Sequence, residues 1–447
     1  MALDGAPLAL AILAVFGLGM AIAARYKRSS PRLSGYVSFA VVGLAFAAAA
    51  LPAREFSVIG FAGTSVEQRL RIPLRLGFLA LCLLESLHGI ERRQRIEKWS
   101  HMLLSVCGAV LALSATDLVL VWSGMALYAV AGCVAQADAR VSPRDRRALA
   151  AAATAPVGAS VGLTLLLLSK APMGTVALAG WLAHRVADVS PVTICGLVLL
   201  LGTIAASSGL LPPYRGKGWR ARVLDPVLGL IVLLRVGSAI FASMRDVWCL
   251  SAMALGLVAV LWGVVGFVLT GSAVGRMRWV GICQRGFVLG ALGLALTPLG
   301  FVAAVAGLCA FVASEGILAL NDRTDEGAIV PREADQRPHR IWDCTRLLAV
   351  ASAAAAPLTP GFAARVRLIY EVDQVGMRCI AAMWLGCAVA VACLTLYQAI
   401  RRHDMLCPAV AWTRDRRMSI ATLSLATLIL IIQPMLLPRW VLSVIGY

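Results

Sequence analysis

Charged residues are scarce in this chain, and acidic residues and lysine are the scarcest. Asp, Glu, Lys and Arg make up 14% of the 447 residues, and only 23 residues are acidic. Lysine occurs four times, so nearly every strong cation is an arginine. Apolar residues make up 60% of the chain, and the mean hydropathy is +0.84. Ordinary soluble proteins contain about 45–50% apolar residues, so this composition excludes a soluble globular protein.

Two chemical signatures are missing as well. No pair among the 12 cysteines has C-x-x-C spacing, and most cysteines fall inside apolar stretches, where a thiol behaves as a small hydrophobe. There is no glycine-rich phosphate loop. The sequence therefore indicates neither a metal or iron–sulfur centre nor a nucleotide site.

The chain instead contains about fourteen apolar stretches, each long enough to cross a bilayer. They lie at roughly 7–24, 34–52, 72–90, 100–115, 117–135, 149–168, 191–213, 224–244, 247–271, 278–296, 299–320, 343–370, 376–400 and 418–445. The loops between them are short. The predicted fold is an all-α polytopic membrane protein with no separate soluble domain.

Proline and glycine interrupt two of these stretches at corresponding places. The interrupting residues are Pro212 and Pro213 in the seventh stretch, and Pro357, Pro360 and Gly361 in the twelfth. A backbone break inside a bilayer survives only where it faces protein or a wet cavity. A matched pair of breaks is the best sequence indication of an ion or substrate path near mid-membrane.

The two breaks lie five spans apart, which predicts two inverted five-helix repeats. The corresponding segments are a three-helix segment (1–95), a first repeat of helices 4–8 (96–246), a second repeat of helices 9–13 (247–400), and a last loop and helix (401–447).

The net charge of +18 has its explanation in the loops. Odd-numbered loops carry most Lys and Arg, for example Arg25, Lys27 and Arg28, or Arg220 and Arg222, whereas even-numbered loops are short or poor in positive charge. The positive-inside rule then places both termini on the periplasmic or intermembrane side. We favour this over nucleic-acid binding as the reason for the basic composition.

Four motifs follow one another in order over roughly residues 95–400. They are Trp99 to Tyr128 with Asp117, Leu118 and Gly124; Asp225, Pro226 and Val227; Gln284, Arg285, Gly286 and Phe287; and Pro357 to Phe362 followed by Arg365 and Tyr370. These motifs resemble the antiporter-like membrane subunits of respiratory complex I, and length and motif order are most similar to its subunit N (mitochondrial chain 2). Each motif is short, and the specificity comes from their order on a fourteen-span frame.

The resemblance also shows where the ion path has changed. The family has a Glu on the fifth span and a Lys on the broken seventh span, and the corresponding positions here are Ala126 and Ser207. The family's basic positions on the eighth and twelfth spans correspond to Arg235 and Arg365, and a tenth-span His position corresponds to Gln284. Arginine stays charged in proteins and cannot relay a proton as lysine can.

Glu315 is a further candidate, because an acidic residue in the middle of an apolar span is costly and is normally functional. Arg235, Gln284, Glu315 and Arg365 are therefore the predicted proton-path residues, and a structural hydrogen bond is the alternative role. Asp225, beside Pro226, is predicted to cap the helix that starts there.

The resemblance implies a membrane-arm subunit of a complex I-type NADH:quinone oxidoreductase, with proton translocation that is partly lost. Flavin and iron–sulfur clusters would lie in partner subunits, and this chain would bind no cofactor. Its partners would be other membrane-arm subunits and lipids, in the mitochondrial inner membrane or the bacterial plasma membrane. The alternatives are a subunit of a cation/proton antiporter, membrane-bound hydrogenase or bicarbonate-uptake complex, or a structural spacer without an ion path.

Overall fold

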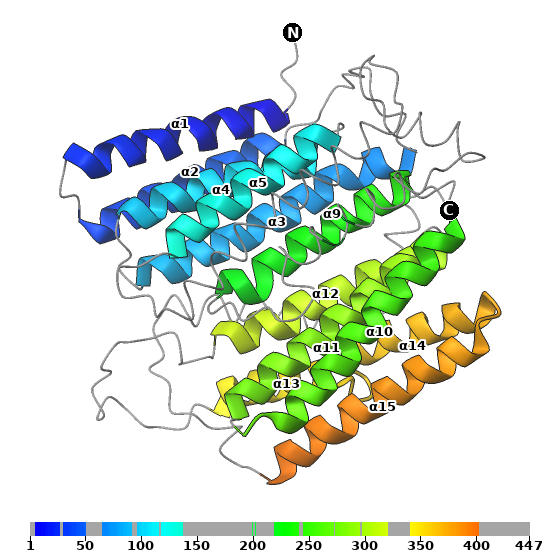
Figure 1. Ribbon diagram of the computed structural model, residues 1–447. Helices are drawn as coiled ribbons and strands as arrows, with labels where there is room; N and C mark the ends of the chain where they lie inside the picture. Colours follow the sequence, from blue (N-terminus) through cyan, green and yellow to red (C-terminus); the bar gives the residue numbers. More distant parts are fainter. Residues whose placement is uncertain are drawn as a thin grey trace. The chain divides into compact units, whose positions relative to one another are not determined.

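The computed structural model describes residues 5–26, 30–50, 65–91, 96–115, 118–136, 199, 202, 219–240, 245–271, 273–295, 297–320 and 340–401. These residues are almost entirely helical and contain no strand (Figure 1). The helices are α1 (Gly5–Tyr26), α2 (Pro31–Ala50), α3 (Ser65–Glu91), α4 (Ile96–Ser114), α5 (Leu118–Gln136), the π-helix η2 (Arg220–Leu224), α9 (Asp225–Ile240), α10 (Arg245–Leu269), α11 (Ala273–Gly293), α12 (Pro298–Leu320), α13 (Arg340–Ala354), α14 (Pro360–Gln374) and α15 (Arg378–Arg401).

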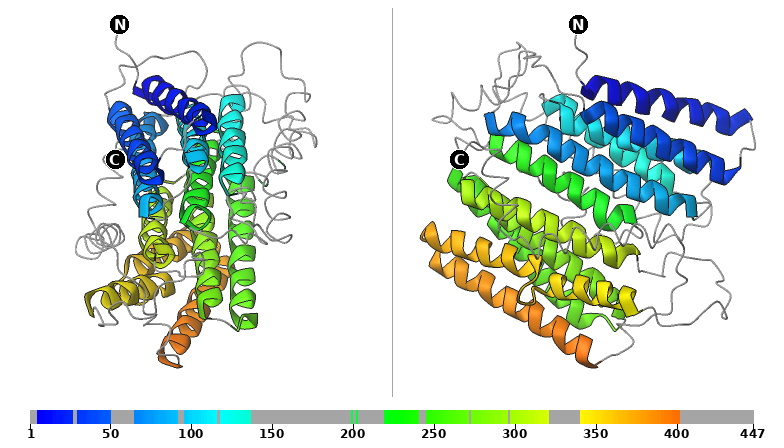
Figure 2. Two further views of the ribbon diagram at one scale, coloured as in Figure 1. Left: turned by 90° about the vertical axis from the view of Figure 1, so that its left-hand side faces the viewer. Right: turned by 180° about the vertical axis from the view of Figure 1, so that it is seen from behind.

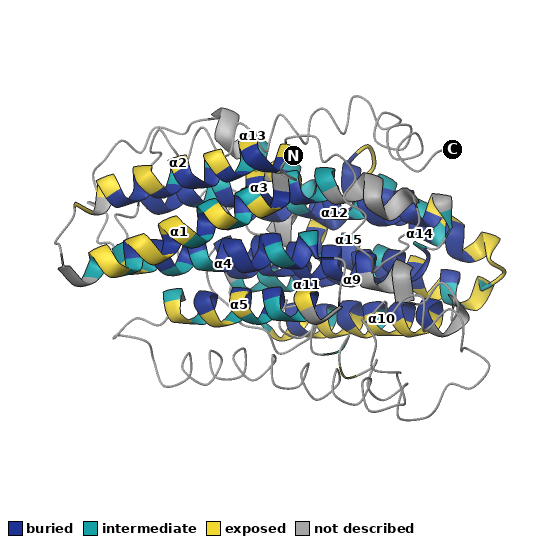
Figure 3. Ribbon diagram, turned by 90° about the horizontal axis from the view of Figure 1, so that it is seen from above, coloured by how far each residue is buried: buried dark blue, intermediate teal, exposed yellow. Residues whose placement is uncertain are grey.

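Seven of the described helices are long and apolar enough to span a membrane, and α5 is a shorter apolar helix. Their outer faces are apolar: Val15, Leu18 and Ile22 of α1 and Leu269 of α10 are more than half exposed. Figure 3 shows exposed residues along α1, α2 and α10. Such faces suit lipid and would be unfavourable in water. The all-α polytopic fold is confirmed, and the count of fourteen spans stays a prediction.

By its internal contacts the chain divides into two compact units, residues 1–209 with 231–244, and residues 210–230 with 245–447. In the first unit α4 packs against α1 and α5, and α2 packs against α1 and α3. In the second unit α11 packs against α10 and α12, and α14 packs against α12 and α15. The predicted repeat boundaries at 96, 247 and 400 stay predictions.

Glycine allows the closest helix pair of each unit to approach. A Cβ atom on Gly108 of α4 would lie 2.7 Å from the carbonyl oxygen of Gly124 on α5, and one on Gly124 would lie 2.6 Å from that of Gly108. In the second unit, a Cβ on Gly256 of α10 would lie 2.6 Å from the carbonyl oxygen of Gly286 on α11, and the reverse distance is the same. Any larger residue would push these helices apart, as expected of small residues at membrane helix contacts.

The break predicted in the twelfth span is present. Helix α13 ends at Ala354, and α14 begins at Pro360, so the two halves are separate ribbons that follow one another (Figure 2). Ala355 and Leu358 between them have positive φ angles of 59° and 68°. Thr359 caps α14 by accepting a hydrogen bond from the Phe362 amide, with proline in the first turn.

The break lies at the level of the middle of α12, and Pro357 and Leu358 within it are exposed. Helix α12 runs from Pro298 to Leu320, so its midpoint is near Cys309. A Cβ on Gly307 would lie 4.0 Å from the Cβ of Ala364, in the second turn of α14. Ala364, four residues after the start of α14, therefore packs against α12 only two residues from the midpoint of that helix. The predicted break of the seventh span, with Pro212 and Pro213, lies outside the described residues.

Candidate functional site

The second unit contains a buried ion pair between Arg222 and Glu315. The guanidinium Nε and Nη2 of Arg222 both lie 2.7 Å from Glu315 Oε1, and the side chains are 6% and 1% exposed. Arg222 comes from η2 and Glu315 from α12. The geometry is tight and charge-assisted, which a buried carboxylate needs if it is to stay ionised.

Glu315 was predicted to lie at the middle of its span, but it lies nearer one end of its helix. Helix α12 runs from Pro298 to Leu320, close to the predicted span, and ends five residues after Glu315. Glu315 therefore lies about 9 Å from the helix midpoint at a rise of 1.5 Å per residue, toward the C-terminal end.

Glycine makes room for the carboxylate. Gly281 of α11 faces it, and a Cβ there would lie 2.8 Å from Glu315 Oε2. An alanine at 281 would therefore displace the carboxylate or α11. Gly281 was not among the site residues predicted from the sequence.

A proline explains why η2 is a π-helix. Pro226 has no N–H, so the carbonyl of Arg222, four residues earlier, lacks its usual helical donor. The Asp225 amide instead donates to the Arg220 carbonyl, five residues back, which is the π-helical pattern. Arg285 Nη2 of α11 supplies the missing donor to the Arg222 carbonyl at 3.1 Å.

Two predictions near η2 were wrong. Arg220 and Arg222 were assigned to a loop as topology signals, but both are helical and buried, at 9% and 5% exposed. Asp225 does not cap a helix start. It has αR backbone angles within a continuous helical segment, and its carboxylate pairs with Arg220 Nε at 3.3 Å.

Gln284 lies in the middle of α11 and is bonded to α12. Its Nε2 is 3.0 Å from Ser314 Oγ, and Ser314 Oγ donates to Gln284 Oε1 at 3.2 Å. The neighbouring Arg285 places its guanidinium 5.7 Å from the centre of the Phe311 ring. The structure thus brings Gln284 and Glu315 to adjacent places on the α11–α12 contact, because Ser314 and Glu315 are consecutive.

Arg365 lies in the second turn of α14, beside the break. Its Nη2 donates to the Ala353 carbonyl at 2.6 Å and its Nη1 to the Ala354 carbonyl at 3.4 Å, at the C-terminus of α13. The guanidinium carbon lies 4.3 Å from the centre of the Phe287 ring. Arg365 is 4% exposed and therefore joins the two halves of the broken helix from inside the bundle.

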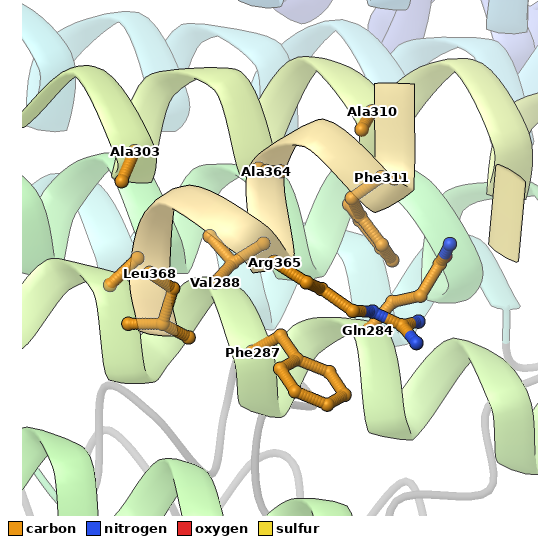
Figure 4. A pocket seen from close by; sticks show the side chains of 12 residues that line it. Gln284, Phe287, Val288, Ala303, Ala310, Phe311, Ala364, Arg365 and Leu368 are labelled. Atoms are coloured by element: carbon orange, nitrogen blue, oxygen red, sulfur yellow. The ribbon is translucent and has the colours of Figure 1, made fainter. Parts of the chain in front are cut away.

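Arg365 and Gln284 line one cavity of the second unit (Figure 4). The cavity has a volume of about 20 Å³ and is bordered by α11, α12 and α14. Phe287, Phe311 and Gly361 also line it. Three predicted residues, Arg365, Gln284 and Gly361, thus share one site.

Arg235 belongs to the first unit and contacts a helix end. Its Nη1 donates to the carbonyls of Ala112 and Leu113 at 3.0 and 2.7 Å, and its Nη2 donates to that of Ala115 at 2.8 Å. These carbonyls belong to the C-terminus of α4, where a helix leaves acceptors without partners. Arg235 is 7% exposed and so works as a long-range cap of α4.

A second arginine of this kind was not among the residues predicted from the sequence. Arg75 of α3 is 2% exposed, and its Nη2 donates to the Ala49 carbonyl at the end of α2 at 2.8 Å. Its Nη1 is 3.3 Å from Ser114 Oγ at the end of α4. A basic residue inside an apolar span, two positions after Pro73, was the available signal.

The remaining predicted positions carry little local chemistry. Ala126 is half-buried on α5 and cannot titrate. Ser207 lies outside the described residues. In the part of the chain that the structure describes, no group of three or more His, Cys, Asp or Glu side chains could hold a metal ion.

Solved structures share this fold over the whole chain. A chain of the Mrp complex from Dietzia sp. DQ12-45-1b has a TM-score of 0.76 at 17% identity, covering 100% of this chain and 97% of that one. A chain of respiratory complex I from Thermus thermophilus has a TM-score of 0.73 at 18% identity, covering 96% and 98%. A chain of the membrane-bound sulfane sulfur reductase, an archaeal respiratory membrane complex, has 0.73 at 15% identity, covering 99% and 97%.

No protein-family model and no curated protein sequence matches the chain. At the identities above, the solved structures establish the fold. The chain is therefore an all-helical polytopic membrane protein with the fold found in chains of these three membrane complexes. Which complex it belongs to is a matter for proposal.

Proposed function

We propose that this chain is an antiporter-like membrane subunit of a multi-subunit complex of the complex I type. One observation carries the proposal: the fold matches a complex I chain from end to end, covering 96% of this chain and 98% of that one. The broken helix with a buried basic residue after Gly361 and Phe362 adds to it, because this was the motif behind the sequence resemblance. Flavin, iron–sulfur and quinone chemistry would then belong to partner subunits.

A second candidate is a subunit of an Mrp-type assembly. The chain of the Mrp complex has the higher TM-score, 0.76, and covers all of this chain. The same fold thus occurs in different assemblies, and fold alone does not decide between them.

Partner proteins separate the two candidates. Purification of the tagged full-length chain in mild detergent, followed by mass spectrometry, identifies what it is bound to. Flavin and iron–sulfur proteins in stoichiometric amounts support the complex I proposal. A set made only of small membrane proteins and further antiporter-like chains supports the Mrp-type alternative and overturns the first.

We further propose that proton translocation through this chain is degenerate. Of the four predicted proton-path residues, Glu315 alone has a carboxyl group, and the guanidinium and amide groups of the other three do not exchange protons near neutral pH. Arg235 and Arg365 donate to helix ends, and Glu315 is held by Arg222. A relay needs several groups that change protonation, so a weak path through the second unit, or a spacer without a path, fits these contacts.

The test compares proton uptake with substrate turnover in vesicles that contain the purified complex. Replacing Glu315 with Gln keeps the shape of the side chain and removes its charge. If Glu315 is part of a path, the number of protons moved per turnover falls while turnover itself continues. An unchanged ratio in an intact complex supports the spacer.

The topology proposal follows from the loop charges. Both termini would lie on the periplasmic or intermembrane side, opposite the odd-numbered loops. Reporter fusions after the first and second spans test this. An external location for the loop with Arg25, Lys27 and Arg28 would contradict it.

A further inference from the structure

The cavity beside the helix break is small. Its volume of about 20 Å³ is enough for one water-sized or halide-sized particle. Gln284, Phe287, Phe311, Gly361 and Arg365 are among the residues that line it. In Figure 4 the side chains of Arg365 and Gln284 extend into the same region.

Arg365 has more donors than the described residues use. A guanidinium carries five N–H groups. Two of them reach the carbonyls of Ala353 and Ala354, and no other acceptor among the described residues is bonded to Arg365. The side chain is 4% exposed, so the remaining N–H groups face the protein interior and the cavity. Gln284 adds a further amide N–H, because Ser314 is its one bonded partner there.

The charge of Arg365 lacks a carboxylate partner in this place. None of the residues that line the cavity is acidic. The C-terminus of α13 and the N-terminus of α14 meet beside Arg365, and their partial charges of about −0.5 and +0.5 offset each other. The Phe287 ring covers one face of the guanidinium at 4.3 Å but carries no net charge. An uncompensated cation at this depth is costly, so a small anion would stabilise it.

We propose that this cavity binds one monovalent, halide-sized anion, with chloride as the physiological example. Arg365 and Gln284 donate to it, and Gly361 belongs to the wall of the cavity. The site goes beyond the proposed function, because it depends only on contacts within the second unit. Its role would be to hold the two halves of the broken helix together.

Binding of radiolabelled chloride to the purified full-length chain tests the proposal. Detergent solutions of constant ionic strength, balanced with gluconate, give the number of sites and the affinity. We expect saturable binding of about one chloride per chain. Absence of saturable binding to the folded wild-type chain overturns the proposal and shows that the cavity holds water only. Because the isolated chain is used, this result is independent of which complex it belongs to.

Variants locate the site. Ala310→Leu fills the cavity without changing charge and should weaken chloride binding at least tenfold. Ala382→Leu on the exposed face of α15 is the matched control and should bind as wild type. Unchanged binding by a folded Ala310→Leu chain overturns the assignment.

If Ala310→Leu does not fold, two other measurements decide. Gln284→Leu should weaken binding several-fold, because one donor is lost while Arg365 remains. Crystals grown in bromide should show an anomalous peak within hydrogen-bonding distance of the Arg365 guanidinium. A peak elsewhere, or none, overturns the proposal.

Discussion

The two units of this protein use buried arginines in different ways. In the first unit, Arg75 and Arg235 donate to the C-terminal carbonyls of α2 and α4. In the second unit, Arg222 is paired with the carboxylate of Glu315. The first arrangement satisfies acceptors that every helix end leaves open, and the second neutralises a charge. Inside a membrane, an arginine therefore does not by itself indicate an ion path, and its acceptor must be known.

Arg365 of the second unit resembles the arginines of the first unit. It donates to the end of α13 as Arg235 does to the end of α4, but in addition it lines a cavity. The position that resembles the family's twelfth-span basic residue therefore has a structural function here, besides any role with ions.

Removing the carboxylate of the buried pair should have the largest effect. Glu315→Ala leaves Arg222 charged and buried without its partner, and loss of one member of a buried pair costs about 3–5 kcal/mol. Thermal unfolding in detergent measures the loss. Asp373→Asn is the matched control, because Asp373 and Arg378 form an exposed pair at 3.9 Å, and its removal should leave stability nearly unchanged. Equal stability of the two variants would contradict the role of the buried pair.

Replacing Arg235 should have a somewhat smaller effect. Arg235→Met leaves the carbonyls of Ala112, Leu113 and Ala115 without their donor, which should cost about 2–3 kcal/mol, because buried acceptors that lose their partners cost about 1–3 kcal/mol. Arg235→Lys should retain part of the stability, since an ammonium reaches fewer of these oxygens than a planar guanidinium. Hydrogen exchange at the end of α4 is the measurement. If the Arg235→Met and Arg235→Lys variants both exchange at the wild-type rate there, the capping role is wrong.

Two glycine-to-alanine substitutions should change the stability of the protein in opposite directions. Gly124→Ala should destabilise by about 1–3 kcal/mol, because its Cβ would lie 2.6 Å from the Gly108 carbonyl oxygen and the helices must move apart. Gly386→Ala on α15 meets nothing within 4 Å and should be neutral or stabilising, as alanine favours a helix. Comparison of the two melting temperatures checks the sign. A stabilising Gly124→Ala would show that α4 and α5 do not pack in this way.

Features that depend on neighbouring residues could be predicted from the sequence. The length of the apolar stretches predicted the helices, and Pro357, Pro360 and Gly361 predicted the break, because proline and glycine change the backbone at their own positions. The partners could not be predicted in the same way. Arg222 and Glu315 are 93 residues apart in the chain, and Arg285 reaches the Arg222 carbonyl only because Pro226 leaves that carbonyl without a donor. Such pairs depend on helix packing, which the sequence alone does not reveal.

The smallest effect is expected in the first unit, where a carboxylate is restored at Ala126. The family's fifth-span Glu works with a partner on the seventh span, and the corresponding position here is Ser207. Ala126→Glu would place an unpaired carboxyl group on a half-buried membrane helix, where it tends to take up a proton and stay neutral. The number of protons moved per turnover in vesicles should therefore not change.

The double variant Ala126→Glu with Ser207→Lys adds the missing partner. An increase with the single variant would show that the first unit retains a path that lacks only this carboxylate. An increase confined to the double variant would show that the pair was the missing element, and no increase in either would place the loss of the path deeper in the unit.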